Sequence, residues 1–160
     1  MQVSKAIAQR IKEVYFGGSW TTASVKEFLT GLSIKEANTI LNDGNSIYTI
    51  LHHCHYYTLV QRNVLLGKEL LGSDKESFEV PPINSEGELN HFKTKVLEEA
   101  NDFINLVHKL DDEILMQPFF AEKYGNYYRN LNGLIEHWNY HLGQLYYIRK
   151  YLISTNSSEK

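Results

Sequence analysis

Apolar residues recur at intervals of three and four along four long stretches of the chain, a pattern typical of amphipathic helices. Two shorter stretches between the first two each begin with a serine followed three residues later by a glutamate, which is the signature of a capping box. The long helices are expected at Ser4–Tyr15, Asn45–Leu71, Ser85–Met116 and Asn130–Leu152, and the short ones at Ser24–Leu29 and Ile34–Leu41. No stretch alternates between apolar and polar residues with a period of two, so no strand is predicted.

The segments between these helices are rich in turn and loop residues. Asn42-Asp43-Gly44 predicts a turn, and the polar stretch Ser73–Asn84 predicts a long crossover loop. Pro118 is expected to end the third long helix, and an aromatic connector, Phe119–Tyr128, leads into the fourth. Together the elements predict an all-α fold, a four-helix bundle with a short helical insert between its first two helices.

The 160-residue length and the 42% hydrophobic content suit one domain with one core, which we place at residues 1–153, followed by a polar tail over 154–160. The net charge is −3 and no basic run is present, which argues against nucleic acid as the main partner. No apolar run reaches the ~18 residues of a membrane span, and the N-terminal residues lack a signal-peptide core. The single cysteine, Cys54, excludes an internal disulfide. These features predict a soluble cytoplasmic protein.

The fourth predicted helix contains two histidines, His137 and His141, four residues apart. On a helix this spacing places both imidazoles on one face, one turn apart, where they can bind one metal ion. Apolar residues at helical spacing surround them, so this face is expected to look into the core. An unpaired polar group there would cost about 1–3 kcal/mol, which a shared metal would avoid. The alternative is a pair of core histidines bonded to a tyrosine or to backbone carbonyls.

A third ligand is expected from the second long helix, which contains His52, His53 and His55. A rotation of about 100° per residue puts His53 at the edge of the apolar face, on a ridge that includes Tyr57. His52 falls nearly opposite, as a surface histidine, and His55 falls on a mixed face from which it can support the site. Helix geometry therefore favours His53, with His52 and His55 as the alternatives.

Two sequence motifs resemble those of a known family. Ser46–His53 reads Ser-Ile-Tyr-Thr-Ile-Leu-His-His, with a histidine six residues after an apolar position. His137–Leu145 reads His-Trp-Asn-Tyr-His-Leu-Gly-Gln-Leu. Both resemble motifs of the DinB-like (damage-inducible) four-helix-bundle superfamily of metal-dependent hydrolases and low-molecular-weight thiol transferases. The likeness extends over nearly the whole chain in helix order and spacing.

This resemblance implies an up-up-down-down bundle with a three-histidine metal site. Carried over residue by residue, the ligands are His53, His137 and His141. Gln144 matches the family's glutamine and is expected to face the pocket or to hold a ligand ring. Tyr140 and Tyr57 complete the expected pocket.

The resemblance also implies a function. The protein is expected to bind one divalent transition metal ion, for which three imidazoles suit zinc, nickel, iron or copper, and to transfer a low-molecular-weight thiol such as bacillithiol or mycothiol. One alternative is a metal-dependent hydrolase of a small-molecule substrate, and another is a non-catalytic metal- or small-molecule-binding stress protein. A homodimer is expected. The aromatic connector is expected either to form an apolar surface or to line the pocket mouth.

Overall fold

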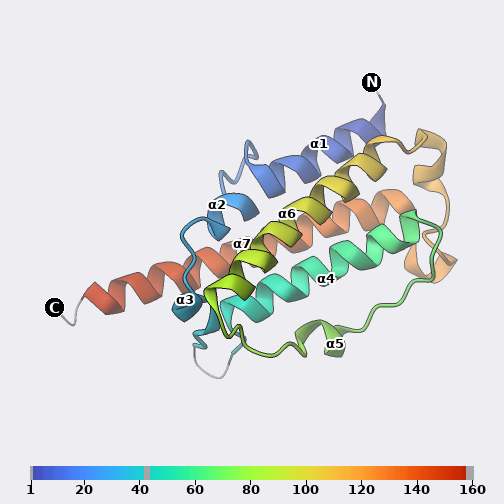
Figure 1. Ribbon diagram of the computed structural model, residues 1–160. Coiled ribbons are helices and arrows are strands. Elements are labelled where there is room, and N and C mark those ends of the chain that lie inside the picture. The colour runs from blue at the N-terminus through green and yellow to red at the C-terminus, as the bar shows by residue number, and fades with distance from the viewer. Residues whose placement is uncertain (1, 42–43, 158–160) are drawn as a thin grey trace.

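The computed structural model describes residues 2–41 and 44–157, and the chain is helical throughout these residues except for its connections (Figure 1). The α-helices are α1 Val3–Phe16, α2 Val25–Leu29, α3 Ile34–Asn38, α4 Ile47–Leu65, α5 Asp74–Phe78, α6 Glu86–His108 and α7 Tyr127–Ser157. Two 3-10 helices, η1 Asp112–Met116 and η2 Glu122–Tyr124, lie between α6 and α7. Within the described residues there is no β-strand, only an isolated bridge between Pro118 and Asn126. In this part of the chain, no helix combines the length and the apolar character that crossing a membrane requires.

The four long helices α1, α4, α6 and α7 pack side by side around one core (Figure 1). α1 contacts α6 and α7, and α4 contacts the same two helices. Trp138, Tyr15, Phe28 and Phe103 are among the largest fully buried side chains. The all-α prediction is therefore confirmed.

α4 and α6 run in the same direction. The Tyr48 ring, near the start of α4, packs 4.9 Å from the Phe92 ring near the start of α6. Further along both helices, Arg62 forms an ion pair with Asp102 at 3.5 Å. Parallel neighbours need a connection that returns to the starting end, and here residues 66–85 supply it (Figure 1).

α1 and α7 run opposite to these two helices. α1 begins beside the start of η1, shortly after the end of α6, because the backbone N–H of Val3 donates to Asp112 at 2.8 Å. Near the end of α4, Gln61 donates to the carbonyl of Asn130 at the start of α7, at 3.0 Å. The predicted up-up-down-down order is therefore wrong: the first and last helices run one way and the middle two the other (Figure 1). The insert of α2 and α3 makes α4 begin at the end of the bundle where α1 stops.

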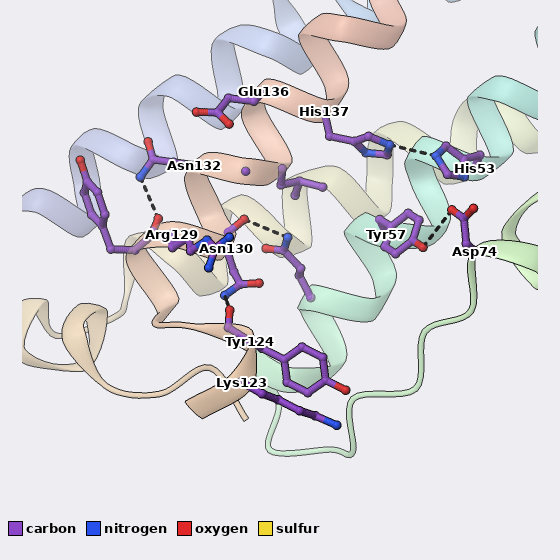
Figure 2. A pocket seen from close by; sticks show the side chains of 14 residues that line it. His53, Tyr57, Asp74, Lys123, Tyr124, Arg129, Asn130, Asn132, Glu136 and His137 are labelled. Carbon is purple, nitrogen blue, oxygen red and sulfur yellow. Dashed lines mark hydrogen bonds between the residues drawn. The ribbon is translucent and has the colours of Figure 1, made fainter. Parts of the chain in front are cut away.

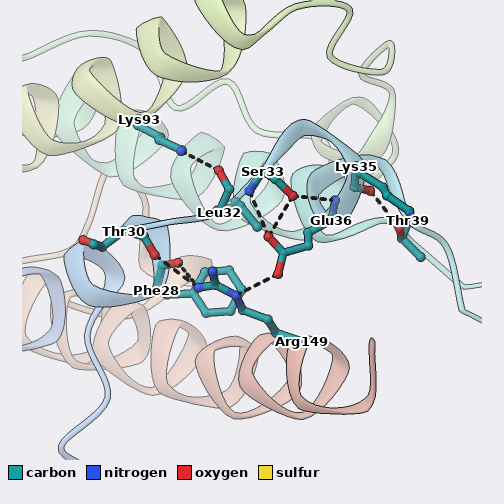
Figure 3. A network of polar contacts seen from close by, with 9 residues as sticks. All are labelled: Phe28, Thr30, Leu32, Ser33, Lys35, Glu36, Thr39, Lys93 and Arg149. Carbon is teal, nitrogen blue, oxygen red and sulfur yellow. Dashed lines mark hydrogen bonds and ion pairs between the residues drawn. The ribbon is translucent and has the colours of Figure 1, made fainter. Parts of the chain in front are cut away.

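Figure 3 shows how the helical insert is attached to the bundle. From α7, the Arg149 guanidinium donates to the carbonyl of Phe28 at 2.9 Å and to the Glu36 carboxylate at 3.2 Å. From α6, the Lys93 ammonium donates to the carbonyl of Leu32 at 2.6 Å. The expected serine caps of α2 and α3 are both present, and Ser33 with Glu36 forms a complete capping box. These contacts hold the insert against two long helices.

Several predicted helix boundaries are wrong. α4 ends at Leu65 rather than Leu71, because Gly67 adopts a φ of +74°, a conformation that ends helices and that glycine adopts at low cost. The third long helix stops at His108, and residues 112–116 form a separate 3-10 helix. α3 ends at Asn38 rather than Leu41.

The last helix is longer than expected. α7 extends to Ser157, so residues 154–157 of the predicted tail are helical. The remainder of that tail, like Asn42 and Asp43 of the predicted turn, lies outside the described residues.

Candidate metal centre

Three histidines from two antiparallel helices converge on one point. His53 comes from α4, and His137 and His141 come from α7. One ring nitrogen from each lies within 4.8 Å of the others, so the three can hold a metal ion. The Nε2 atoms of His53 and His137 are 2.9 Å apart (Figure 2). His53 is 4% exposed and His141 9%, while His137 is half-buried.

These distances suit a shared ion. Imidazole nitrogens lie about 2.0–2.1 Å from zinc. Two such nitrogens on one ion are therefore separated by about 2.9 Å at a right angle and about 3.4 Å at the tetrahedral angle. The 2.9 Å between the Nε2 atoms of His53 and His137 matches the first value. Of the three histidines on α4, the structure brings His53 to the site.

A hydrogen bond next to the site fixes how α4 and α7 are aligned along their lengths. Trp138, next to His137, is 1% exposed, and its indole N–H donates to the hydroxyl of Thr58 on α4 at 3.1 Å. The Tyr15 hydroxyl from α1 lies 2.7 Å from the same oxygen. Large buried aromatic rings fit in one position only, so this contact fixes the height at which His137 meets His53.

The ring of His53 is oriented by α5. Its Nδ1 lies 2.7 Å from the Ser77 hydroxyl, and that hydroxyl donates to the carbonyl of Asp74 at 2.6 Å. Since the hydroxyl hydrogen is used there, Ser77 must accept from an Nδ1–H of His53. The lone pair of His53 is then on Nε2, which faces the site. The Phe78 ring stacks on a face of the His53 ring, with the two centroids 3.9 Å apart and the two planes 12° apart.

The ring of His141 is oriented in the same way by Gln144. Its Nδ1 lies 2.9 Å from Oε1 of Gln144, an acceptor, so the hydrogen is on Nδ1 and the lone pair on Nε2. Gln144 thus occupies the position expected of it, against a histidine ring. With both neighbours protonated on Nδ1, the contact between His53 and His137 is made by an Nε2–H of His137. A metal ion bound between the two Nε2 atoms would take the place of this Nε2 hydrogen of His137.

The surroundings of His53 and His137 favour the uncharged imidazole. Burial and the nearby His141 and His53 lower the pKa of His137 to about 4, although Asp74 opposes this. Burial and His141 also lower the pKa of His53. Neutral imidazole is the form that binds metal. His53 and His137 therefore remain available as ligands at pH values below the usual histidine pKa.

These shifts predict an acid-sensitive metal-free protein. The unfolded chain protonates His137 near pH 6.5 and the folded chain only near pH 4. The unfolded state then binds more protons between these values, so the stability that His137 contributes is complete above pH 6.5 and falls as the pH drops toward 4. In urea titrations of chelator-treated protein, His137→Gln is expected to flatten this decline. An equally steep decline in the variant would contradict the assignment.

The short helix α5 was missed by the sequence analysis, which placed a loop there. Its signal is present: Ser73 is followed three residues later by Glu76, and the Ser73 hydroxyl accepts from the Glu76 backbone N–H at 3.3 Å. α5 provides Asp74, Ser77 and Phe78 to the site. It also covers His52, whose Nδ1 lies 2.9 Å from the Ser77 carbonyl, so His52 is half-buried and not the surface histidine expected.

The other three residues expected at the pocket lie in different places: one is at the site, one is at its outer edge and one is away from it. The Tyr57 ring lies 5.2 Å from the His53 ring and 5.5 Å from that of His137, and its hydroxyl donates to Asp74 at 3.3 Å. Tyr140 is 72% exposed and touches the site from outside, 4.9 Å from the His141 ring. His55 is at the α4–α6 interface, 2.6 Å from the Glu99 carboxylate. Two residues turn a helix by about 200°, so His55 points away from His53 and the expectation that it supports the site is wrong.

A cavity of about 840 Å³ opens beside the histidines (Figure 2). His53, His137 and Tyr57 line it, and Tyr124 and Tyr128 place part of the aromatic connector at its wall. The carboxylates of Asp74 and Glu136 also line the cavity. The arrangement thus combines a possible metal centre with space for a small organic molecule.

Comparison with family models, with curated proteins and with solved structures gives no significant match.

Proposed function

We propose that this protein is a DinB-like metalloprotein that binds one divalent transition metal ion, such as zinc, nickel or iron, through His53, His137 and His141. We propose further that it transfers a low-molecular-weight thiol to a small-molecule acceptor. The observation that carries the proposal is the set of three ring nitrogens within 4.8 Å of one another, two of whose residues, His53 and His137, line a cavity of about 840 Å³. Ligands from the second and the last long helix are what the resemblance to this superfamily implies.

The residues around the site have definite tasks in such a reaction. A bound metal ion would keep the substrate sulfur as a thiolate, its reactive form. Ser77 and Gln144 hold the rings of His53 and His141 with their lone pairs toward the site. The carboxylate of Asp74, which accepts the Tyr57 hydroxyl, is a group that can take up the proton released by the thiol.

The Asp74 carboxylate also supports a second candidate, metal-dependent hydrolysis. Hydrolysis requires a general base close to the attacking water. Asp74 and Glu136 both line the cavity, but the Glu136 carboxylate points away from the His137 ring in Figure 2, which leaves Asp74 as the candidate base. The Asp74 carboxylate accepts from the Tyr57 hydroxyl at 3.3 Å, and the Tyr57 ring lies 5.2 Å from that of His53, so Asp74 supports the hydrolase alternative as this base.

A conjugation assay tests the proposal. Metal-loaded protein is expected to accelerate the displacement of chloride from 1-chloro-2,4-dinitrobenzene by a low-molecular-weight thiol at least about tenfold above the reaction of the free thiol, a modest rate gain for a metal-assisted enzyme. His137→Ala is expected to remove this gain. Product absorbance measures the rate, and bacillithiol, cysteine and glutathione serve as thiols.

No acceleration with any of these thiols would contradict thiol transfer. Turnover of an ester, amide or lactam panel that depends on His137 and Asp74 would then favour hydrolysis. If neither assay shows turnover while metal is bound, the non-catalytic binding protein is the better explanation.

A further inference from the structure

The charged groups of the site cavity are separated along its length. Asp74 lies near the histidines, since its carboxylate accepts a hydrogen bond from Tyr57, whose ring is 5.2 Å from that of His53. Lys123 and Arg129 line the cavity as well. In Figure 2, Lys123 lies on the opposite side of the view from the histidines, with Arg129 on the α7 wall. The cavity therefore has a cationic end away from the histidines.

Both cations are held in place by their neighbours. Gly125 has a φ of +76°, and a Cβ built there would lie 3.0 Å from Cδ of Arg129, so the Arg129 stem packs directly over the glycine. The Lys123 ammonium lies over the Tyr124 ring, 4.8 Å from its centroid. Side chains positioned in this way lose less freedom when they bind a ligand.

These two cations have no counter-charge of their own. In the described part of the chain, neither Lys123 nor Arg129 forms an ion pair with a carboxylate, whereas Arg62 and Arg149 both do. Two unpaired positive charges on one cavity wall attract an anionic group. A guanidinium in particular binds carboxylate or phosphate oxygens in pairs.

The spacing sets the length of the ligand. Arg129 and His137 are eight residues apart on helix α7, which is about 12 Å along the helix axis. An extended chain covers about 3.3–3.6 Å per residue, so a ligand that reaches both ends has the length of roughly three to four amino-acid residues. A single amino acid is too short.

We propose that the cavity binds an elongated thiol whose anionic group, a carboxylate or a phosphate, pairs with Lys123 and Arg129 while its sulfur reaches the three histidines. This deepens the proposed function, on which the identification of the histidine-bound end as sulfur rests. Lys123 and Arg129 then determine which thiols are accepted, and they hold the ligand in one direction.

Calorimetric binding to zinc-loaded protein tests this with two pairs of probes that differ in anionic charge. Reduced glutathione and its diethyl ester test for a carboxylate, and 4′-phosphopantetheine and pantetheine test for a phosphate. In the wild type, the charged member of at least one pair is expected to bind about tenfold more tightly. The double variant Lys123→Gln/Arg129→Gln is expected to bring this ratio close to one. Lys12→Gln/Lys150→Gln, which removes two exposed cations elsewhere, is expected to leave it unchanged.

The pair with the larger ratio identifies the anionic group. The proposal is overturned if no probe binds, if both ratios are near one in the wild type, or if the Lys123/Arg129 variant keeps the wild-type ratio. The conjugation assay separates this from the proposed function. Equal turnover of charged and uncharged thiols would leave thiol transfer in place and remove the anion site. Charge-dependent binding without turnover would leave the anion site in place and remove thiol transfer.

Discussion

Single replacement of His53, His137 or His141 by alanine is expected to reduce the metal content from about one ion per chain to below about 0.1, because a three-ligand site that loses one protein ligand binds too weakly to survive purification. Elemental mass spectrometry on tag-free protein measures this directly. Added zinc is also expected to raise the melting temperature of the wild type and not that of the variants, since an ion that binds only the folded state stabilises it.

His91→Ala is the matched control, because His91 is an exposed histidine on α6. It is expected to keep its metal. Retention of metal by His53→Ala together with loss in His137→Ala would remove His53 from the ligand set. A wild type that takes up no metal even after reloading would mean that the three histidines are packing groups, and the enzyme proposals would be abandoned.

Thr58→Val is expected to lower the free energy of unfolding by about 2–6 kcal/mol, although the two side chains have nearly the same shape. The Thr58 hydroxyl donates to the carbonyl of Cys54 and accepts from Trp138 and Tyr15. Burial raises the pKa of Tyr15, so its hydroxyl stays protonated and needs an acceptor. Valine would leave two buried donors without one, at about 1–3 kcal/mol each.

Urea denaturation measures this loss, with Thr94→Val as the control. Thr94 is exposed on α6, so the same change there is expected to alter the stability by less than about 0.5 kcal/mol. Because Thr58 fixes the register beside His137, the Thr58→Val variant is also expected to bind zinc more weakly. A stability within about 1 kcal/mol of the control would show that the two donors find other acceptors.

The sequence by itself determined the local structure. The spacing of apolar residues predicted the four long helices, and the serines at 24 and 33 predicted the caps of α2 and α3. The four-residue spacing of His137 and His141 predicted that both rings share one helix face, and the two ring centroids lie 4.7 Å apart, in agreement with this. All of these features depend on interactions between residues a few positions apart in the sequence, so a local sequence pattern is enough to predict them.

Only the tertiary structure decided what depends on contacts between distant segments. The directions of the helices follow from where each connection ends, and no local pattern reports this. The separation of His53 from His52 and His55 required α5 and α6, which cover His52 and bind His55. The cationic end of the cavity combines the connector with the first turn of α7. The physical reason is that such contacts form only when the whole core packs, so their partners cannot be read from the residues nearby.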